Sequence, residues 1–303
     1  MKINDLPLNS EIAAGTETES LLPPNPKSSG QRGWSRARRI PALIAGSIMM
    51  LLLILAAILI PWLSPYDPIT QDLSAFLQPP SAQHWLGTDQ LGRDLFTRLI
   101  YAARTDLGIM VLAEIIPFVS GIAIGMLAGY YGGWVNTVVS LVTDTFIAFP
   151  FYLIVIIVAF ASGAGAQGIY ITFMLVGWIV FARVSRGLTA SLRQQEWVAS
   201  AQTLGLPGWQ ILLRHLLPNI LPQAVVVLMT DMVGVLVAIV TLGYLGIGIA
   251  PPTPDWGTMI ADGQSFMTTA WWLSAVPGFA VVYTGISLSL IGDGLSDLWR
   301  RKS

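Results

Sequence analysis

The sequence contains no cysteine and only two histidines, and charged residues make up just 11% of its 303 residues. The absence of cysteine excludes disulfide bonds, thiolate nucleophiles and every zinc or iron–sulfur site that needs Cys ligands. His84 and His215 lie in different loops, so a metal site built only from histidine is excluded as well. A net charge of −1 gives no basis for a nucleic-acid-binding surface. We therefore expect no metal site and no nucleic-acid partner.

The common catalytic motifs are missing too. None of the lysines, Lys2, Lys27 and Lys302, follows a glycine, so the chain has no Gly-x-x-x-x-Gly-Lys-[Ser/Thr] loop to bind ATP phosphates. Neither Gly-x-Ser-x-Gly nor His-Glu-x-x-His occurs. We expect no catalytic residue and no cofactor. If the protein drives transport, the energy must come from a partner chain or an ion gradient.

Hydrophobic residues are abundant, at 54% of the chain, and the mean hydropathy is +0.66. This composition is typical of integral membrane proteins. Residues 42–60 carry no charge and would form a helix of roughly 28 Å, enough for one membrane span. Five more apolar segments follow, at 107–131, 135–161, 169–182, 220–248 and 271–291. The prediction is an all-α polytopic membrane protein with six transmembrane helices.

Small and charged residues inside these segments suggest how the spans pack. Gly121, Gly125 and Gly129 repeat at four-residue spacing, which predicts a face for close helix packing. Carboxylates are costly at membrane depth and usually face a bundle interior or a wet pathway. Asp231 falls near the middle of the fifth span and is the best candidate for lining a substrate pathway. Asp144, ahead of Pro150, could line the pathway or brace a kinked helix. Glu114 falls near the outer end of the second span, where water could solvate it.

A polar interval between the fourth and fifth spans has an ordered pattern. Trp197, Ala201 and Leu204 are spaced to share one face of a short helix, and Gly205 and the Pro207-Gly208 pair should end that helix. A second amphipathic piece follows, with apolar residues predicted on one face: Trp209, Leu212, Leu213 and Leu216. The interval therefore predicts a helix, a tight turn and a second helix, although many loops in polytopic proteins are only connectors.

This interval resembles the EAA loop of the permease subunits of ABC importers, which couples the pore to a separate ATPase. Aligned on Gly205, the spacing to Leu217-Pro218 is kept. The Glu-Ala-Ala triplet falls on Ala199, Ser200 and Ala201, so its Glu is missing, and the nearest carboxylate is Glu196. The resemblance implies that six residues take part in ATPase coupling: Glu196, Ala199, Ser200, Ala201, Gly205 and Pro218.

The segment before the second span carries a further motif, Leu-Gly-Thr-Asp-x-Leu-Gly-Arg-Asp at residues 86–94. From the residues alone we expect an interfacial amphipathic helix with Thr88 or Asp89 as its N-cap, Leu91, Leu95 and Leu99 on one face, and charges that snorkel to water. The motif also resembles the C-type permease of dipeptide, oligopeptide and nickel importers. Further resemblances occur in order, at Asp144 with Phe149-Pro150, at residues 245–257 and at residues 271–295.

The resemblance covers residues 40–298 and implies a type I ABC importer permease fold, forming half of a pore for peptides or a related solute such as a nickel chelate or glutathione. It implies a homologous second permease, two ATP-binding subunits, an extracytoplasmic solute-binding protein and surrounding membrane lipid as partners. The bacterial plasma (inner) membrane is the expected location. The rival hypotheses are a self-sufficient secondary transporter or channel and, more distantly, a membrane enzyme. A secondary transporter should show an inverted repeat with paired broken helices, and we find no convincing one.

Charge distribution predicts the orientation and the domain organisation. With the N-terminus inside, 13 of the 16 Lys and Arg residues fall on the inner side, which predicts that both termini are cytoplasmic. Residues 1–39 are polar and rich in Pro, Ser, Thr and Glu, typical of a disordered tail. The transmembrane permease domain is predicted over 40–298, with an outer loop at 63–106 and the cytoplasmic coupling loop at 186–219. Residues 299–303 form the predicted C-terminal tail.

Overall fold

The computed structural model describes residues 39–163 and 165–300. The chain divides into two units, Met1–Arg39 and Ile40–Ser303, and the second contains the helical bundle. The predicted disordered tail lies almost wholly outside the described residues, as do residues 301–303. The described part is helical throughout, apart from loops and one isolated β-bridge. The elements are α2 (Arg39–Leu63), η1 (Leu73–Ala75), α3 (Leu95–Tyr131), α4 (Gly133–Ile147), α5 (Phe151–Ala161), α6 (Ala166–Val176), α7 (Trp178–Leu192), α8 (Glu196–Thr203), α9 (Gly208–Gln210), η2 (Ile211–Leu216), α10 (Leu217–Tyr244), α11 (Trp256–Gln264) and α12 (Trp272–Arg300).

Within the described residues, five helical stretches are long and apolar enough to cross a membrane by themselves: Pro41–Ile60, Leu95–Tyr131, Ala166–Leu192, Gly208–Tyr244 and Trp272–Trp299. A sixth forms only if α4 and α5 count as one span, because the two helices meet at 91°. Pro150 is the N-cap of α5; proline lacks a backbone N–H and disfavours helical geometry in the residue before it, which separates the two helices. The all-helical polytopic prediction is confirmed, and the third predicted span is a bent pair.

Several of the remaining helices extend beyond the predicted spans, although the fifth ends at Tyr244 and not at residue 248. The second span starts at Leu95 instead of residue 107, and the fourth runs from Ala166 to Leu192 and not only over 169–182. The last helix continues to Arg300, past the predicted start of the tail at residue 299. Hydropathy marks only the apolar middle of each helix, whereas tertiary packing and caps determine where the backbone hydrogen bonding ends.

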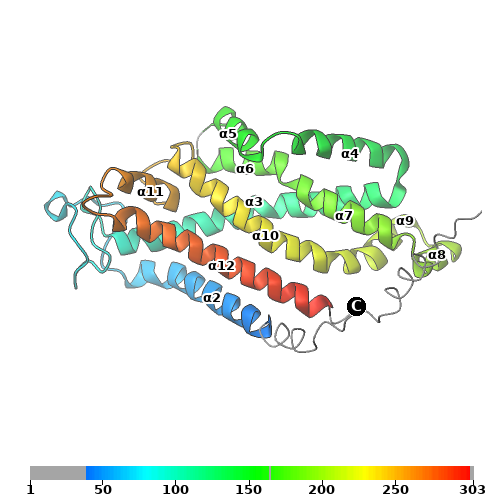
Figure 1. Cartoon of the computed structure of the whole chain (residues 1–303), viewed down its shortest axis with the longest axis horizontal. Helices are drawn as coiled ribbons and strands as arrows, with labels where there is room; N and C mark the ends of the chain where they lie inside the picture. Colours follow the sequence, from blue (N-terminus) through cyan, green and yellow to red (C-terminus); the bar gives the residue numbers. More distant parts are fainter. Residues whose placement is uncertain (1–38, 164, 301–303) are drawn as a thin grey trace, which may run out of the picture. The chain divides into compact units, whose positions relative to one another are not determined.

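The predicted glycine face lies between α3 and α7. A Cβ on Gly121 would collide with the Trp178 carbonyl, and one on Gly125 would collide with the backbone of Ala182. At Gly129 the obstacle is the backbone carbonyl of Arg186. The close approach of these helices, which run side by side in Figure 1, therefore depends on the absence of side chains along this face.

Two hydrogen bonds join the first span to the last. Ser287 Oγ donates to the Gly46 carbonyl at 2.8 Å, and Tyr283 Oη donates to the Met49 carbonyl at 3.1 Å. The helices α3, α10 and α12 run along the bundle, with α11 and the loop before α3 at one end and α8 at the other (Figure 1). The two loop regions highlighted by the sequence thus lie at opposite ends of the same helices.

Candidate functional site

The loop between α7 and α10 contains a short helix, α8, that is fastened to the bundle on one side only. Val198 and Ala201 are buried in a cluster that also includes Met126 and Tyr130 of α3. The predicted apolar face is therefore wrong in detail, because Trp197 and Leu204 point outward and Leu204 is 81% exposed. An i, i+3 pair is enough to anchor one side of a two-turn helix.

Gly205 ends α8 in the way the sequence predicts. Its φ is +78°, in the left-handed region. Its N–H donates to the Gln202 carbonyl at 3.0 Å, and the next N–H, of Leu206, donates to the Ala201 carbonyl at 3.2 Å. This pair of bonds is the Schellman motif, and Leu206 packs against the same cluster as α8. The turn therefore sets the direction in which the chain leaves α8.

The second predicted helix of this loop is continuous with the fifth span. From Gly208 the chain passes through α9 and the π-helical η2 into α10 without a break. Ile211, Leu212 and Leu216 are buried in the cluster beneath α8. Trp209 and Leu213, predicted for the same face, are 63% and 58% exposed. The loop and the fifth span therefore share one uninterrupted helical stretch, with Pro222 inside α10.

Four large apolar residues of the loop have exposed side chains: Trp197, Leu204, Trp209 and Leu213. We name these four residues the loop face. Of the predicted coupling residues, Glu196, Ala199, Ser200, Gly205 and Pro218 are exposed, and Ala201 is buried. A regular helical period of about 3.6 residues predicts Trp209 and Leu213 on the apolar face. The π-helical turn of η2 interrupts that period. Large apolar side chains that stay exposed in a loop are candidates for an interaction surface.

The predicted pathway residues Asp231 and Asp144 are not brought together. Asp231 lines a cavity of about 470 Å³ bordered by α4, α5, α6, α7 and α10. Its other walls are mainly aromatic and aliphatic, with Phe149, Tyr152 and Phe173 among them. Asp144 is exposed on α4 and is not among the residues that line this cavity. The structure thus places Asp231 at a cavity, which the sequence could not establish.

The expectation that water solvates Glu114 is wrong. Only 2% of the residue is exposed, and its carboxyl group lies beside that of Asp231 on α10. The reason is the early start of α3, which places Glu114 well inside the helix and not near its outer end. The sequence signal was the rarity of carboxylates in apolar helices, but only the fold brings this one next to Asp231.

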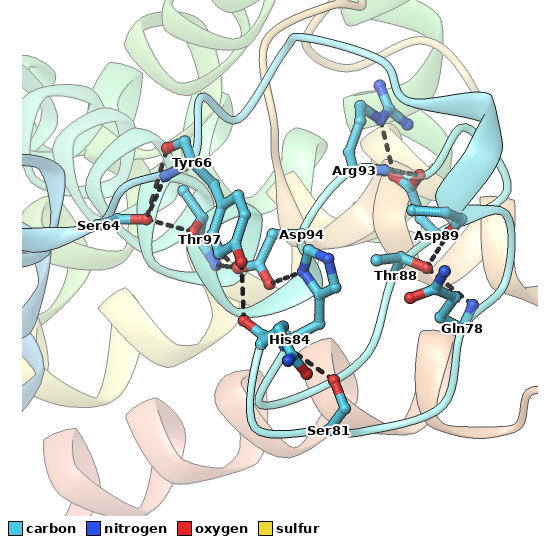
Figure 2. Close-up of polar contacts among 12 residues, drawn as sticks. Ser64, Tyr66, Gln78, Ser81, His84, Thr88, Asp89, Arg93, Asp94 and Thr97 are labelled. Atoms are coloured by element: carbon cyan, nitrogen blue, oxygen red, sulfur yellow. Dashed lines mark hydrogen bonds and ion pairs between the residues drawn. The ribbon is translucent and has the colours of Figure 1, made fainter.

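The loop before α3 is held by a buried polar network, shown in Figure 2. Asp89 accepts a 2.7 Å bond from Arg93 Nε, and Arg98 Nε lies 3.3 Å from the same carboxylate. Arg98 also donates to the Pro68 carbonyl at 2.8 Å. All three charged residues are buried. The prediction that these charged groups reach water is therefore wrong, because each of them is paired in the interior of the protein.

The N-cap of α3 is Asp94, not Thr88 or Asp89 as predicted. Asp94 Oδ2 accepts from the backbone N–H of Thr97 at 2.8 Å, and Oδ1 lies 2.9 Å from His84 Nδ1 (Figure 2). Leu91 lies before the helix and so cannot share the predicted face with Leu95 and Leu99. Thr88 instead ties the loop to itself, donating to the Ala75 carbonyl. The motif at 86–94 builds a compact loop rather than an interfacial helix.

The segment at residues 251–257 docks on the same end of α3. Trp256 is fully buried, its backbone N–H donates to Asp106 Oδ2 at 2.9 Å, and its indole N–H donates to the Leu99 carbonyl at 3.1 Å. Asp255 caps α11 by accepting from the Thr258 N–H at 3.0 Å. Burial raises the pKa of the Asp255 carboxyl above its usual value, against the effect of the Thr258 hydrogen bonds. Sequence reasoning missed Asp106 as the partner of this segment.

Comparisons with known proteins agree with this architecture. Residues 121–302 match the family described as binding-protein-dependent transport system inner membrane component. That match covers more than half of the chain. The chain belongs to this family. Residues 28–80 match a second family, the N-terminal TM domain of oligopeptide transport permease C.

Individual relatives align with most of this chain. The dipeptide transport system permease protein DppC of Bacillus subtilis is 33% identical, over 93% of this chain and 88% of its own length. The probable D,D-dipeptide transport system permease protein DdpC of Escherichia coli is 33% identical, over 85% and 87% respectively. The glutathione transport system permease protein GsiD of Pectobacterium atrosepticum is 34% identical, over 87% and 88%.

The protein is therefore a multi-pass inner-membrane permease subunit of an ABC importer, and the resemblance inferred from the sequence motifs is confirmed. Permease subunits of this class are not enzymes, and ATP hydrolysis belongs to a separate subunit of the complex. This result favours the importer over the self-sufficient secondary transporter and the membrane enzyme.

Proposed function

We propose that the permease forms half of the translocation pore of an importer for di- or oligopeptides, including peptides such as glutathione. The observation that carries this proposal is the extensive similarity to permeases of dipeptide and glutathione systems. The aromatic and aliphatic cavity beside Asp231 supports it, because its volume of about 470 Å³ is that of a small-molecule site.

The complex would contain a homologous second permease, two ATP-binding subunits and an extracytoplasmic solute-binding protein. Large apolar residues on α2 support contact with lipid or a second subunit, since Leu51, Leu52 and Ile58 are each more than half exposed. Both termini and the coupling loop at 186–219 would face the cytoplasm, which the distribution of Lys and Arg supports.

The loop face would dock on the ATPase, with Glu196, Ala199, Ser200, Gly205 and Pro218 on the same exposed loop and Ala201 fixing α8 to the bundle. Closure of the ATPases would displace α8 and η2, and the unbroken helix would carry this movement along α10 to Asp231. Asp144 would contribute from α4 to the pathway only in the assembled pore, because α4 turns it away from the cavity of the single chain.

Transport by the reconstituted complex tests the solute class. Proteoliposomes with both permeases, the ATPases and the binding protein should accumulate labelled dipeptides, oligopeptides or glutathione in an ATP-dependent manner. Nickel chelates serve as the comparison solute. Accumulation of a nickel chelate without any peptide uptake would contradict the proposed solute class.

Site-specific crosslinking tests the coupling surface, and the absence of cysteine makes each introduced thiol unique within this chain. A Trp209→Cys variant in the loop face should crosslink to the ATPase. A Trp85→Cys variant is the matched control, because Trp85 is equally exposed, at 65%, in the loop at the other end of α3. Labelling with a membrane-impermeant maleimide from each side also tests the orientation. Crosslinking of both variants, or of neither, would argue against the loop face as the docking surface.

A further inference from the structure

Glu114 of α3 and Asp231 of α10 form a carboxyl pair in the interior of the bundle. Neither carboxyl oxygen of Glu114 has a hydrogen-bond partner among residues 39–163 and 165–300, and the residue is only 2% exposed. The group beside it is the Asp231 carboxyl, which is near enough to form a hydrogen bond with Glu114 when one of the two carboxyls carries a proton. Within the same described residues, no Lys or Arg forms an ion pair with either carboxyl.

Such an arrangement is incomplete as it stands. A buried polar group without a hydrogen bond costs free energy, and two adjacent carboxylates repel unless a proton or a cation lies between them. Other buried carboxylates in the described residues each accept at least one hydrogen bond: Asp89 from Arg93, Asp94 from Thr97 and Asp106 from Trp256. The pair therefore needs either a shared proton or a positively charged group between the two carboxyls.

A positively charged group can approach the pair from the cavity on the side of Asp231, which is among the lining residues. The rings of Phe149, Tyr152 and Phe173 border the same space. Aromatic faces attract cations, and an apolar surround strengthens the interaction of a cation with a carboxylate. The cavity thus offers a carboxylate end and an aromatic wall to one ligand.

We propose that Glu114 and Asp231 form a binding site for the primary ammonium group of the transported solute. An ammonium that binds Asp231 in the cavity has three N–H donors and one positive charge, so it can take the place of the proton that Asp231 and Glu114 otherwise share. The inference rests on the proposed function, since every unblocked peptide carries such a group. Because Asp231 lies on the helix that begins at the coupling loop, movement of α10 would change the distance between the two carboxyls, and with it the affinity for the ammonium.

The test uses the assembled transporter complex in lipid nanodiscs, without the binding protein, and two probes of similar shape. Phenethylammonium carries the charge, and 2-phenylethanol lacks it. Saturation-transfer NMR should show that the native complex binds the ammonium more tightly than the alcohol. Glu114→Gln and Asp231→Asn keep the side-chain shape, and each should weaken ammonium binding about tenfold or more, as loss of a charge-assisted hydrogen bond predicts. Binding of the alcohol should not change.

An exposed carboxyl on another span supplies the control: Asp293→Asn on α12 should leave binding of both probes as in the native complex. Equal binding of the two probes to the native complex, or full ammonium binding in both carboxyl variants, would overturn the site. Loss of both probes together in a variant with a lowered melting temperature would show that the pair only braces the helices. Peptide uptake is measured separately, so a complex that transports no peptide would refute the proposed function without deciding the binding result.

Discussion

Replacement of Gly205 by Val should uncouple ATP hydrolysis from transport. Gly205 has φ of +78°, and a Cβ added there would meet no atom within 4 Å. Steric contact with the rest of the protein is therefore not the obstacle. The penalty comes from the backbone alone, because a side chain disfavours the left-handed region and a β-branched one disfavours it most.

The size of the effect depends on that conformation. Left-handed backbone geometry costs a residue with a side chain roughly 1–2 kcal/mol, which lowers the fraction of correctly capped loops by about 5- to 30-fold. Leaving the capped geometry also breaks the hydrogen bonds that Gly205 and Leu206 donate to α8. Asn tolerates the left-handed region better than Ala or Val. Uncoupling should therefore increase in the order Gly205→Asn, Gly205→Ala, Gly205→Val.

The assay measures the number of solute molecules transported per ATP hydrolysed in proteoliposomes that hold the complete complex. Gly187→Ala is the matched control, since Gly187 is also exposed with open space around its Cβ position but lies inside α7. This control should keep full coupling and gain about 0.5–1 kcal/mol in helix stability. Full transport by a normally assembled Gly205→Val complex would refute the reasoning. Equal uncoupling by Asn and Val would show that the backbone angle is not the cause.

Three further predictions concern other parts of the chain. Deletion of residues 2–30 should leave transport unchanged, because their composition cannot support a packed core; loss of uptake at normal membrane levels would contradict this. Gly125→Val should lower the melting temperature and impair assembly, because its Cβ would collide with Ser185, whereas Gly108→Ala on the same helix meets open space and should be neutral. Because burial raises the pKa of Asp255, ionisation of this residue costs stability above that pKa, and the cost disappears as the pH falls below the unfolded value. The melting temperature of the native protein should therefore rise relative to that of Asp255→Asn as the pH falls from 7 to about 4; a constant difference would show that Asp255 is not the responsible group.

Local features of the sequence were sufficient to predict the helical elements and some of the turns. The cap at Gly205 could be predicted because a left-handed turn depends on one residue type and its immediate neighbours. The packing role of Gly121 and Gly125 could be predicted because small residues at helical spacing favour close helix contact. The order of spans could be predicted from hydropathy, which depends on composition over short windows.

The faces of short helices were harder to predict. Trp209 and Leu213 were expected to share one apolar face with Leu212 and Leu216. In the structure the buried residues are Ile211, Leu212 and Leu216, because of the π-helical turn and the cluster beneath it. An amphipathic period of one or two turns leaves several faces nearly equivalent, and the neighbouring elements decide among them.

The amino-acid sequence by itself determined that this is an all-helical membrane protein, that it belongs with ABC importer permeases, and that a glycine-capped helix precedes the fifth span. These properties depend on hydropathy, residue type and spacing, which are local. Only the tertiary structure decided that Arg93 and Arg98 are buried with Asp89, and that Glu114 lies beside Asp231. The environment of a charged group depends on residues distant in the chain, because its burial and its partners come from other elements. For that reason the carboxyl pair, and the ammonium site proposed for it, could be recognised only after α3 and α10 had been placed together.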